Sequence, residues 1–154
     1  MTLRTFAIGA ILLLTSMPLL FCAGRRPANL GVSDGSLAPC PSSPNCVSSD
    51  AADESHQVPP FRLAAPPAEA WRAARKAVSE LPRTQIAQET GDYLHAECRS
   101  AVFGFVDDLE LHLRPAEGII AVRSASRLGY SDLGVNRRRV ESLRASLTAL
   151  GALR

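Results

Sequence analysis

The sequence is short of aromatic residues and of any large excess of charge. Aromatic side chains make up only 5% of its 154 residues, and the formal net charge is +2. Apolar residues reach 46%, so a core is available, but it must be built mainly from Leu, Val, Ile and Ala. A nearly neutral chain of this length suits one domain and offers no electrostatic basis for binding nucleic acid.

Cysteine is scarce, and no two cysteines have the Cys-x-x-Cys spacing that activates a redox thiol. Internal repeats and low-complexity tracts are also missing. We therefore expect no catalytic residue, no metal ion and no cofactor.

The first 23 residues have the pattern of an export signal. Arg4 is the only charged residue before Arg25, and the run from Phe6 to Ala23 is uncharged and apolar. A cation followed by such a run is typical of secretory signals, and its length is close to the roughly 20 residues that cross a bilayer. We expect residues 1–23 to be a signal peptide or a membrane-anchor segment, and the rest to be exported to the periplasmic side of the cell envelope.

Cys22 leaves three outcomes open for this leader. It stands where a lipidated cysteine would stand, although bulky Phe21 occupies a position that usually holds a small residue. Ordinary cleavage after Gly24 would also place small residues at the two specificity positions. An uncleaved anchor is the third outcome, which Arg25 and Arg26 oppose because they would follow the span on its outer side.

Residues 24–65 are rich in Pro, Ser, Gly and Asp, which is typical of an extended segment. We expect a flexible tether over 24–36, followed by a single domain over 37–154. Cys40 and Cys46 enclose a short Pro-rich turn, and in an oxidising compartment they are expected to form a disulfide.

Other roles for these cysteines are less well supported. A redox pair lacks the activating spacing, and a metal site formed by Cys40, Cys46 and His56 lacks a fourth ligand. Cys98 is expected to be a buried free thiol.

Two segments have helical periodicity and four have strand periodicity. Apolar residues recur from Trp71 to Leu81, before Pro82, and again from Val140 to Leu150. The strands are expected over 84–90, 93–99, 106–113 and 119–125. Each element has one apolar face, which predicts an α+β two-layer sandwich with an antiparallel sheet of about four strands packed on two helices.

Arginines gather near the last expected helix and suggest an anion-binding surface. Asn136 is a suitable N-cap residue, so the following arginines would lie in the first helical turn, where cations oppose the helix dipole. The expected ligand-binding residues are Arg123, Arg127, Tyr130, Asp132, Arg137, Arg138 and Arg139. The alternative is internal ion pairing of these arginines with Asp107, Asp108 or Asp132.

Polar residues on the second and third expected strands form another candidate site. If the strands pair as neighbours, His95 and Glu97 would lie near Glu110 and His112, a set suited to zinc or to acid–base hydrolysis. Solvated cross-strand pairs on an exposed sheet face explain the same residues without any chemistry.

Several longer strings resemble a known family. They are CPSSPNCVSS from Cys40, YLHAE from Tyr93, FGFVDDLE from Phe103 and VRSASRLGYSDLGVNRRRVE from Val122. From Leu37 to about Leu150 the chain is similar to the bacterial domain-of-unknown-function family 1499. Cys98 departs from that pattern, in which an aromatic residue is usual. The resemblance implies an exported or envelope-associated domain and carries over no reaction, cofactor or catalytic residue.

These observations lead to three functional hypotheses. The first is a non-enzymatic envelope domain that binds an anionic small ligand or a partner protein through the arginine surface. The second is a metal-assisted or acid–base hydrolase that uses His95, Glu97, Glu110 and His112. The third is a structural spacer of the envelope.

Overall fold

The structure of this chain is a computed structural model that describes residues 24–154. Two helices, α2 (Pro67–Ser79) and α3 (Val135–Ala149), accompany eight strands and a short 3-10 turn, η1 (Pro115–Glu117). The strands are β1 (Val32–Ser33), β2 (Ser36–Leu37), β3 (Cys46–Ser48), β4 (Phe61–Arg62), β5 (Thr84–Glu89), β6 (Tyr93–Arg99), β7 (Val106–Arg114) and β8 (Ile119–Ser126). Both predicted helices and all four predicted strands are confirmed, with small shifts at their ends.

The main sheet is antiparallel and larger than the sequence predicted. Its order is β3-β8-β7-β6-β5, with β4 also paired to β8, so it contains six strands rather than about four. The two extra strands, β3 and β4, are three and two residues long. Such short strands show no alternation of apolar and polar residues, and they lie in the segment whose Pro and Ser content indicated extended chain.

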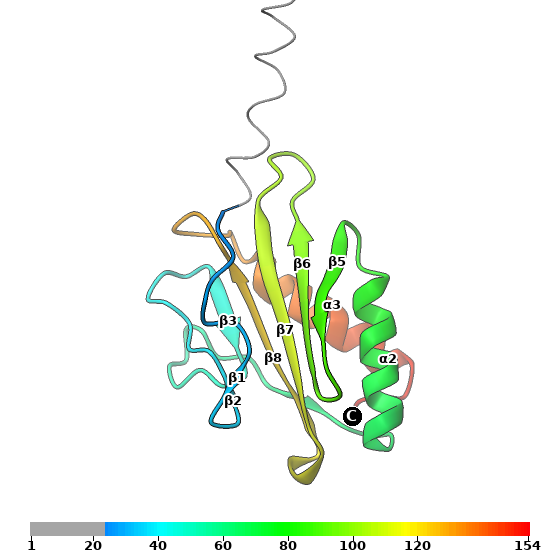
Figure 1. The fold of residues 1–154 in the computed structure, drawn as a ribbon. Coiled ribbons are helices and arrows are strands. Elements are labelled where there is room, and N and C mark those ends of the chain that lie inside the picture. Colours follow the sequence, from blue (N-terminus) through cyan, green and yellow to red (C-terminus); the bar gives the residue numbers. More distant parts are fainter. Residues whose placement is uncertain (1–23) are drawn as a thin grey trace, which may run out of the picture.

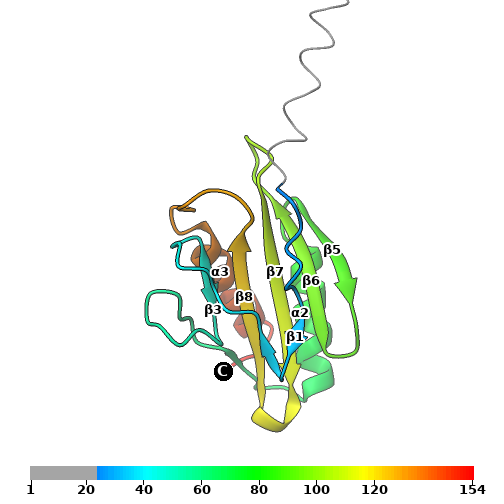
Figure 2. The same cartoon turned by 60° about the vertical axis from the view of Figure 1, so that its left-hand side comes forward.

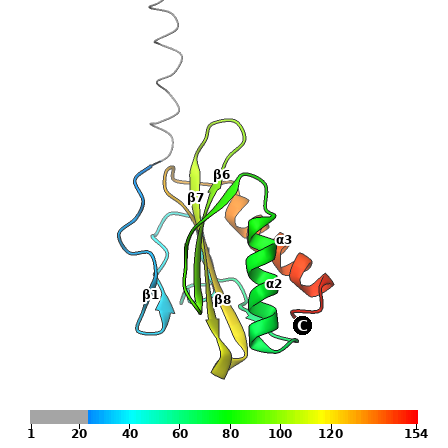
Figure 3. The same ribbon diagram turned by 45° about the vertical axis from the view of Figure 1, so that its right-hand side comes forward.

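Both helices cover one face of this sheet, as Figures 1 and 3 show. The strands contribute the apolar side chains of alternate positions, and the helices contribute the residues of their predicted apolar stripes. Buried core residues include Leu94, Leu109, Leu111, Ile120 and Val122 of the sheet and Trp71, Val78, Val140, Leu143 and Leu147 of the helices. Leu, Val, Ile and Ala dominate this core, as the composition predicted.

The N-terminal part of the described chain lies over the opposite face of the sheet (Figures 2 and 3). This part includes residues 24–36, for which we expected a tether. The short hairpin formed by β1 and β2 belongs to it. At its start, Arg26 contacts Glu97 of β6, and farther on the Gly31 amide donates a hydrogen bond to Glu110 of β7. The sheet is therefore covered on both faces, once by helices and once by irregular chain.

Helix α3 begins differently from the prediction. Gly134, with a φ of 78°, is its N-cap residue, and Asn136 lies inside the first turn with its side chain fully buried. The Asp132 carboxylate accepts hydrogen bonds from the Gly134 and Asn136 amides. The prediction that Asn136 caps this helix is wrong, because Asp132 satisfies the free amides from the preceding loop instead.

The expected signal or anchor segment, residues 1–23 with Cys22, lies outside the described residues. Within residues 24–154, neither helix has the length and apolar composition needed to span a membrane.

Candidate functional site

Charged and polar side chains fill the sheet face beneath the N-terminal segment. We call this set the ionic layer; it consists of Tyr93, His95, Glu97, Asp108, Glu110, Arg123 and Arg127. The sequence predicted that this face is exposed, and that prediction is wrong: His95 is 1% and Glu110 0% accessible. Strand alternation placed these residues on one face correctly, but the N-terminal segment removes the face from solvent.

Glu110 is the most enclosed carboxylate of the ionic layer. Its Oε1 accepts hydrogen bonds from the Tyr93 hydroxyl and the Gly31 amide, both at 2.8 Å. Its Oε2 accepts from Arg123 Nη1 at 2.8 Å. Burial next to this carboxylate raises the pKa of Tyr93 far above its usual range, so the hydroxyl stays protonated and donates. Glu110 thereby ties two strands and the N-terminal segment together.

Asp108 is held by two neighbours. Arg127 donates to both of its oxygens, from Nε at 2.9 Å and from Nη2 at 2.7 Å, and His95 Nε2 lies 2.7 Å from Oδ1. Because an ionised carboxylate only accepts hydrogen bonds, His95 Nε2 is the donor. Burial alone would raise the pKa of Asp108, but the hydrogen bonds from Arg127 and His95 outweigh it and hold that pKa below its usual value.

Glu97 lies at the outer end of the ionic layer. Arg127 Nη2 and Arg26 Nη2 donate to Glu97 Oε1 at 2.7 and 2.6 Å, and Arg99 Nη2 donates to Oε2 at 3.3 Å. Desolvation opposes ionisation of Glu97, yet the hydrogen bonds from Arg127 and Arg26 lower its pKa. All three acids of the layer therefore have arginine partners, which leaves none of them poised to act as a general base.

The structure places the four residues of the proposed hydrolytic set on one face of β6 and β7, but it gives the two histidines other hydrogen-bond partners. His95 pairs directly with Glu110 across β6 and β7, and His112 pairs with Tyr93, as neighbouring strands predicted. However, His95 bonds to Asp108, while His112 Nδ1 lies 3.2 Å from Arg114 Nε. Within residues 24–154, no group of three or more His, Cys, Asp or Glu side chains is arranged to hold a metal ion.

The arginines of the predicted ligand surface do not surround one cavity. Arg123 and Ser124 are consecutive in β8, so their side chains point to opposite faces of the sheet. Arg123 belongs to the ionic layer, whereas Ser124 Oγ accepts a hydrogen bond from Arg139 on the helix side. The sheet itself therefore lies between Arg123 and Arg139.

Each arginine of the first turn of α3 has partners within the domain. Arg139 donates to Asp107 Oδ2 at 2.6 Å and to Asn136 Oδ1 at 2.6 Å. Arg137 donates to two backbone carbonyls of residues 55 and 57, and Arg138 donates to the Leu133 carbonyl. Arg139 pairs with Asp107, and Arg127 pairs with Asp108. The alternative interpretation, internal ion pairing, is therefore confirmed for these two arginines.

The two other predicted ligand residues lie in the loop between β8 and α3. Tyr130 is 77% accessible. Asp132 is occupied by the helix-capping hydrogen bonds described above. Neither side chain is joined to Arg123 by a contact within the described residues.

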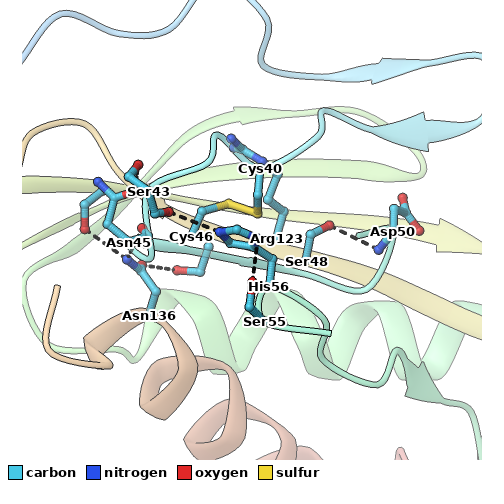
Figure 4. Close-up of a disulfide and its surroundings, with 12 residues drawn as sticks. Cys40, Ser43, Asn45, Cys46, Ser48, Asp50, Ser55, His56, Arg123 and Asn136 are labelled. Atoms are coloured by element: carbon cyan, nitrogen blue, oxygen red, sulfur yellow. Dashed lines mark hydrogen bonds between the residues drawn. A yellow bond between two sulfur atoms is a disulfide. The ribbon is translucent and has the colours of Figure 1, made fainter. Parts of the chain in front are cut away.

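Cys40 and Cys46 form the predicted disulfide, with their Cα atoms 5.7 Å apart (Figure 4). Asn45, next to Cys46, donates to the Gly129 carbonyl, and its own carbonyl accepts from Asn136 Nδ2. These bonds connect the disulfide loop to the β8–α3 loop and to helix α3. The role of Asn45 was not predicted, because its partners are over 80 residues away and nothing near it in the sequence reveals them.

His56 has a structural role beside the disulfide loop. Its Nδ1 lies 2.6 Å from Asp53 Oδ1. Its Nε2 lies 3.1 Å from the Ser43 carbonyl (Figure 4). Both ring nitrogens are therefore engaged, and His56 positions the turn enclosed by the cysteines. Cys98 is the free, buried thiol that was predicted, and burial raises its pKa.

Residues 31–35, GVSDG, have the G-x-S-x-G spacing of a serine nucleophile motif. A nucleophile elbow needs a strand that turns into a helix. Here Ser33 pairs with Ser36 in the β1–β2 hairpin and is exposed to solvent. The spacing therefore marks a hairpin turn in this chain.

A pocket of about 350 Å³ opens between the N-terminal segment and β8. Its walls come from Pro27, Asn29 and residues 39–41 on one side, and from residues 123 and 125–127 together with Asp108 on the other. Arg123 passes beside the disulfide at this place (Figure 4). Among the side chains that the structure describes, its Nε is the one buried polar atom without a hydrogen-bond partner.

The fold and this site define a small α+β domain with a buried ionic layer and, among the described residues, one buried side-chain donor without a partner, Arg123 Nε. The family described as "Protein of unknown function (DUF1499)" matches residues 36–147, and the chain belongs to that family. A search of the curated proteins found no match to this chain.

Proposed function

We propose that this domain binds a small carboxylate- or phosphate-bearing ligand in the pocket beside Arg123 and performs no chemistry on it. The observation that carries the proposal is that Arg123 lines this pocket while its buried Nε has no hydrogen-bond partner among the described residues. A buried donor without an acceptor costs about 1–3 kcal/mol, more when the group is charged. A ligand oxygen would remove that cost.

The chemistry of the guanidinium specifies the class of ligand. Arg123 uses Nη1 for Glu110, which leaves its Nε donor without a partner among the described residues. Two adjacent N–H groups in one plane match the two oxygens of a carboxylate or phosphate. Asn29 adds a polar residue to the opposite wall. A pocket of this size lies at the small end of ligand sites.

The charges near the pocket favour a ligand with little net charge of its own. Asp108 also lines the pocket, but Arg127 donates to both of its oxygens. The two buried arginines are thus already balanced by carboxylates, and no cluster of free cations is available to compensate several negative charges. We therefore propose a single carboxylate or a phosphate ester rather than a polyanion.

We further propose that the domain works outside the cytoplasm, attached to the cell envelope through residues 1–23. The apolar, uncharged run over 6–23 supports this location. The Cys40–Cys46 disulfide supports it independently, because such bonds persist in oxidising compartments and are rare in the cytosol.

The proposal is tested by titrating the protein with inorganic phosphate and, separately, with acetate while recording backbone amide NMR spectra. We expect saturable shifts of the amides of Asn29, Cys40 and Ser126. Arg123→Lys keeps the positive charge near Glu110 but removes the Nε donor, so it should abolish saturation. Arg138→Gln is the matched control, since Arg138 is exposed and bonds only to the Leu133 carbonyl.

The outcomes separate the possibilities. Saturation in the parent and in Arg138→Gln, but not in Arg123→Lys, supports the proposal, and the stronger of the two ions identifies the ligand chemistry. Equal shifts in all three proteins would show nonspecific anion binding and contradict the proposal. If Arg123→Lys unfolds, Asn29→Ala tests the same pocket without disturbing the Arg123–Glu110 pair.

A further inference from the structure

Six large apolar side chains are exposed at one end of the sheet. We call this group the apolar tip; it consists of Val102, Phe103 and Phe105 in the β6–β7 loop and Leu128, Tyr130 and Leu133 in the β8–α3 loop. Val102, Tyr130 and Leu133 are each more than three quarters accessible, at 78%, 77% and 84%. The two loops are neighbours, because the Arg127 amide donates to the Val106 carbonyl.

The exposure of the apolar tip has no explanation within the domain. Phe103 and Phe105 contact each other, with ring centroids 5.7 Å apart, and do not reach the core. Leu133 has a φ of 53°, a conformation that leucine rarely adopts. Contiguous apolar surface of this kind marks a site of interaction with a partner or a membrane.

The start of the described chain lies beside the apolar tip. Gly24 packs so closely there that an added Cβ would come within 2.8 Å of Arg127 Cβ and 3.1 Å of Leu128 Cγ. Figures 1 and 2 show the chain beginning at the end of the sheet that carries both loops. The uncharged residues 6–23 directly precede Gly24 in the sequence. A membrane that holds those residues would therefore face this end of the domain.

The charges around the apolar tip fit an anionic lipid surface. Arg25, Arg99 and Arg138 are exposed at this end. Asp132 is the one acidic residue of the two loops, and its carboxylate caps helix α3. Exposed arginines next to a membrane attract anionic headgroups, and aromatic side chains favour the interface between headgroups and acyl chains.

We propose that the apolar tip rests in the surface of a lipid bilayer, so that the domain is oriented on the membrane and does not hang from a loose tether. The proposal rests on the proposed attachment through residues 1–23 and adds a second contact. In this orientation β7 and β8 run from the membrane outward. The β1–β2 hairpin and η1 lie at the end of the domain that is far from the membrane (Figure 1). The inference concerns a different surface from the Arg123 pocket.

The test uses the full chain reconstituted in vesicles of phosphatidylethanolamine and phosphatidylglycerol, with and without brominated acyl chains. Trp71 is the sole tryptophan and lies in the core, so it is an internal reference that bromine should not quench. Phe103→Trp and Tyr130→Trp place a probe on each loop. Leu150→Trp is the control, because Leu150 is 62% accessible at the C-terminal end of α3.

We expect brominated lipid to remove most of the added emission in Phe103→Trp and Tyr130→Trp, and to shift it to shorter wavelength, while Leu150→Trp is unaffected. Vesicle-bound protein with no quenching of either loop probe would overturn the inference and leave the attachment standing. Loop emission that is already at short wavelength without lipid, and unchanged by bromine, would show that residues 1–23 cover the tip and would also overturn it. Protein that does not sediment with vesicles would contradict the attachment and the inference together; phosphate binding at Arg123 is independent of all these results.

Discussion

Glu110 and Arg123 are direct partners across β7 and β8, and Arg123 Nη1 donates to Glu110 Oε2 at 2.8 Å with both side chains at least 95% buried. The pair lies in the middle of a sheet face that irregular chain, rather than a helix, protects from water. This arrangement connects the stability of the fold to the proposed pocket, because one guanidinium serves both.

Glu110→Gln should lower the free energy of unfolding by about 3 kcal/mol, because removing one partner of a buried ion pair leaves the other charge uncompensated. Urea unfolding measures this difference. Glu117→Gln is the control: Glu117 lies on η1 with its side chain 59% exposed, so its replacement should change stability by less than about 0.5 kcal/mol. Equal effects of the two substitutions would contradict the assigned burial.

Arg139 and Arg138 are sequence neighbours with different expected contributions. Arg139→Ala removes hydrogen bonds to Asp107, Ser124 and Asn136 and should cost about 2 kcal/mol, since the Asp107 carboxylate loses its partner. Arg138→Ala removes one bond to a backbone carbonyl at the surface and should cost less than about 0.5 kcal/mol. Thermal unfolding of both variants checks the difference. A larger loss in Arg138→Ala would be inconsistent with the internal pairing of this turn.

Acid should unfold this domain through its ionic layer. The pKa of Asp108 lies below its usual 3.8 and that of Glu97 below its usual 4.5, so the unfolded chain binds more protons than the folded one in this range. The stabilisation is present above pH 4.5 and is lost as the pH falls below these values. Asp108→Asn should therefore flatten the dependence of unfolding free energy on pH below 4.5.

Asp34→Asn is the control for the acid experiment, because Asp34 lies exposed in the turn between β1 and β2. Its pH dependence should match that of the parent protein. If Asp108→Asn keeps the parent's slope below pH 4.5, the carboxylate does not carry the acid sensitivity, and the assigned hydrogen bonds from Arg127 and His95 would be in doubt.

The disulfide closes a short loop, with a sequence separation of 6 between Cys40 and Cys46. Loop closure of this size should stabilise the folded state by about 2 kcal/mol relative to the reduced protein. Urea unfolding with and without reductant measures that difference. In the double variant Cys40→Ala/Cys46→Ala the reductant should have no effect, which separates the crosslink from other consequences of reduction. Sensitivity of that variant to reductant would contradict the assignment of the stabilisation to the Cys40–Cys46 crosslink.

The sequence predicted the regular elements well because their periodicity is long and uninterrupted. Tyr93–Arg99 is correct to the residue, since seven residues alternate without a break. Strands β3 and β4 were missed because two or three residues cannot show a period. They exist because their partner, β8, offers a free edge, which is a property of the assembled sheet and of no local pattern.

The candidate site was predictable only in part. Alternation identified His95, Glu97 and Glu110 as sharing a face, but it does not reveal whether that face is covered. The covering segment contains few apolar residues and is held by polar contacts such as the Gly31 amide to Glu110, so it resembles a linker in sequence. The pairing of Arg139 with Asp107 was foreseen only as an alternative, because charge alone does not distinguish an internal partner from a ligand.

The proposed binding of an anion beside Arg123 is tested most directly at the Arg123 Nε–H group itself. Side-chain ¹⁵N–¹H spectra of arginine resolve such groups, and the Arg123 signal is identified by its loss in Arg123→Lys. We predict that phosphate or acetate shifts the Arg123 Nε–H signal saturably and slows the exchange of this proton with water. The Nε–H signal of Arg138 should stay in place. If the Arg123 signal does not move, or moves only in parallel with that of Arg138, the pocket does not bind anions and the proposed function is contradicted.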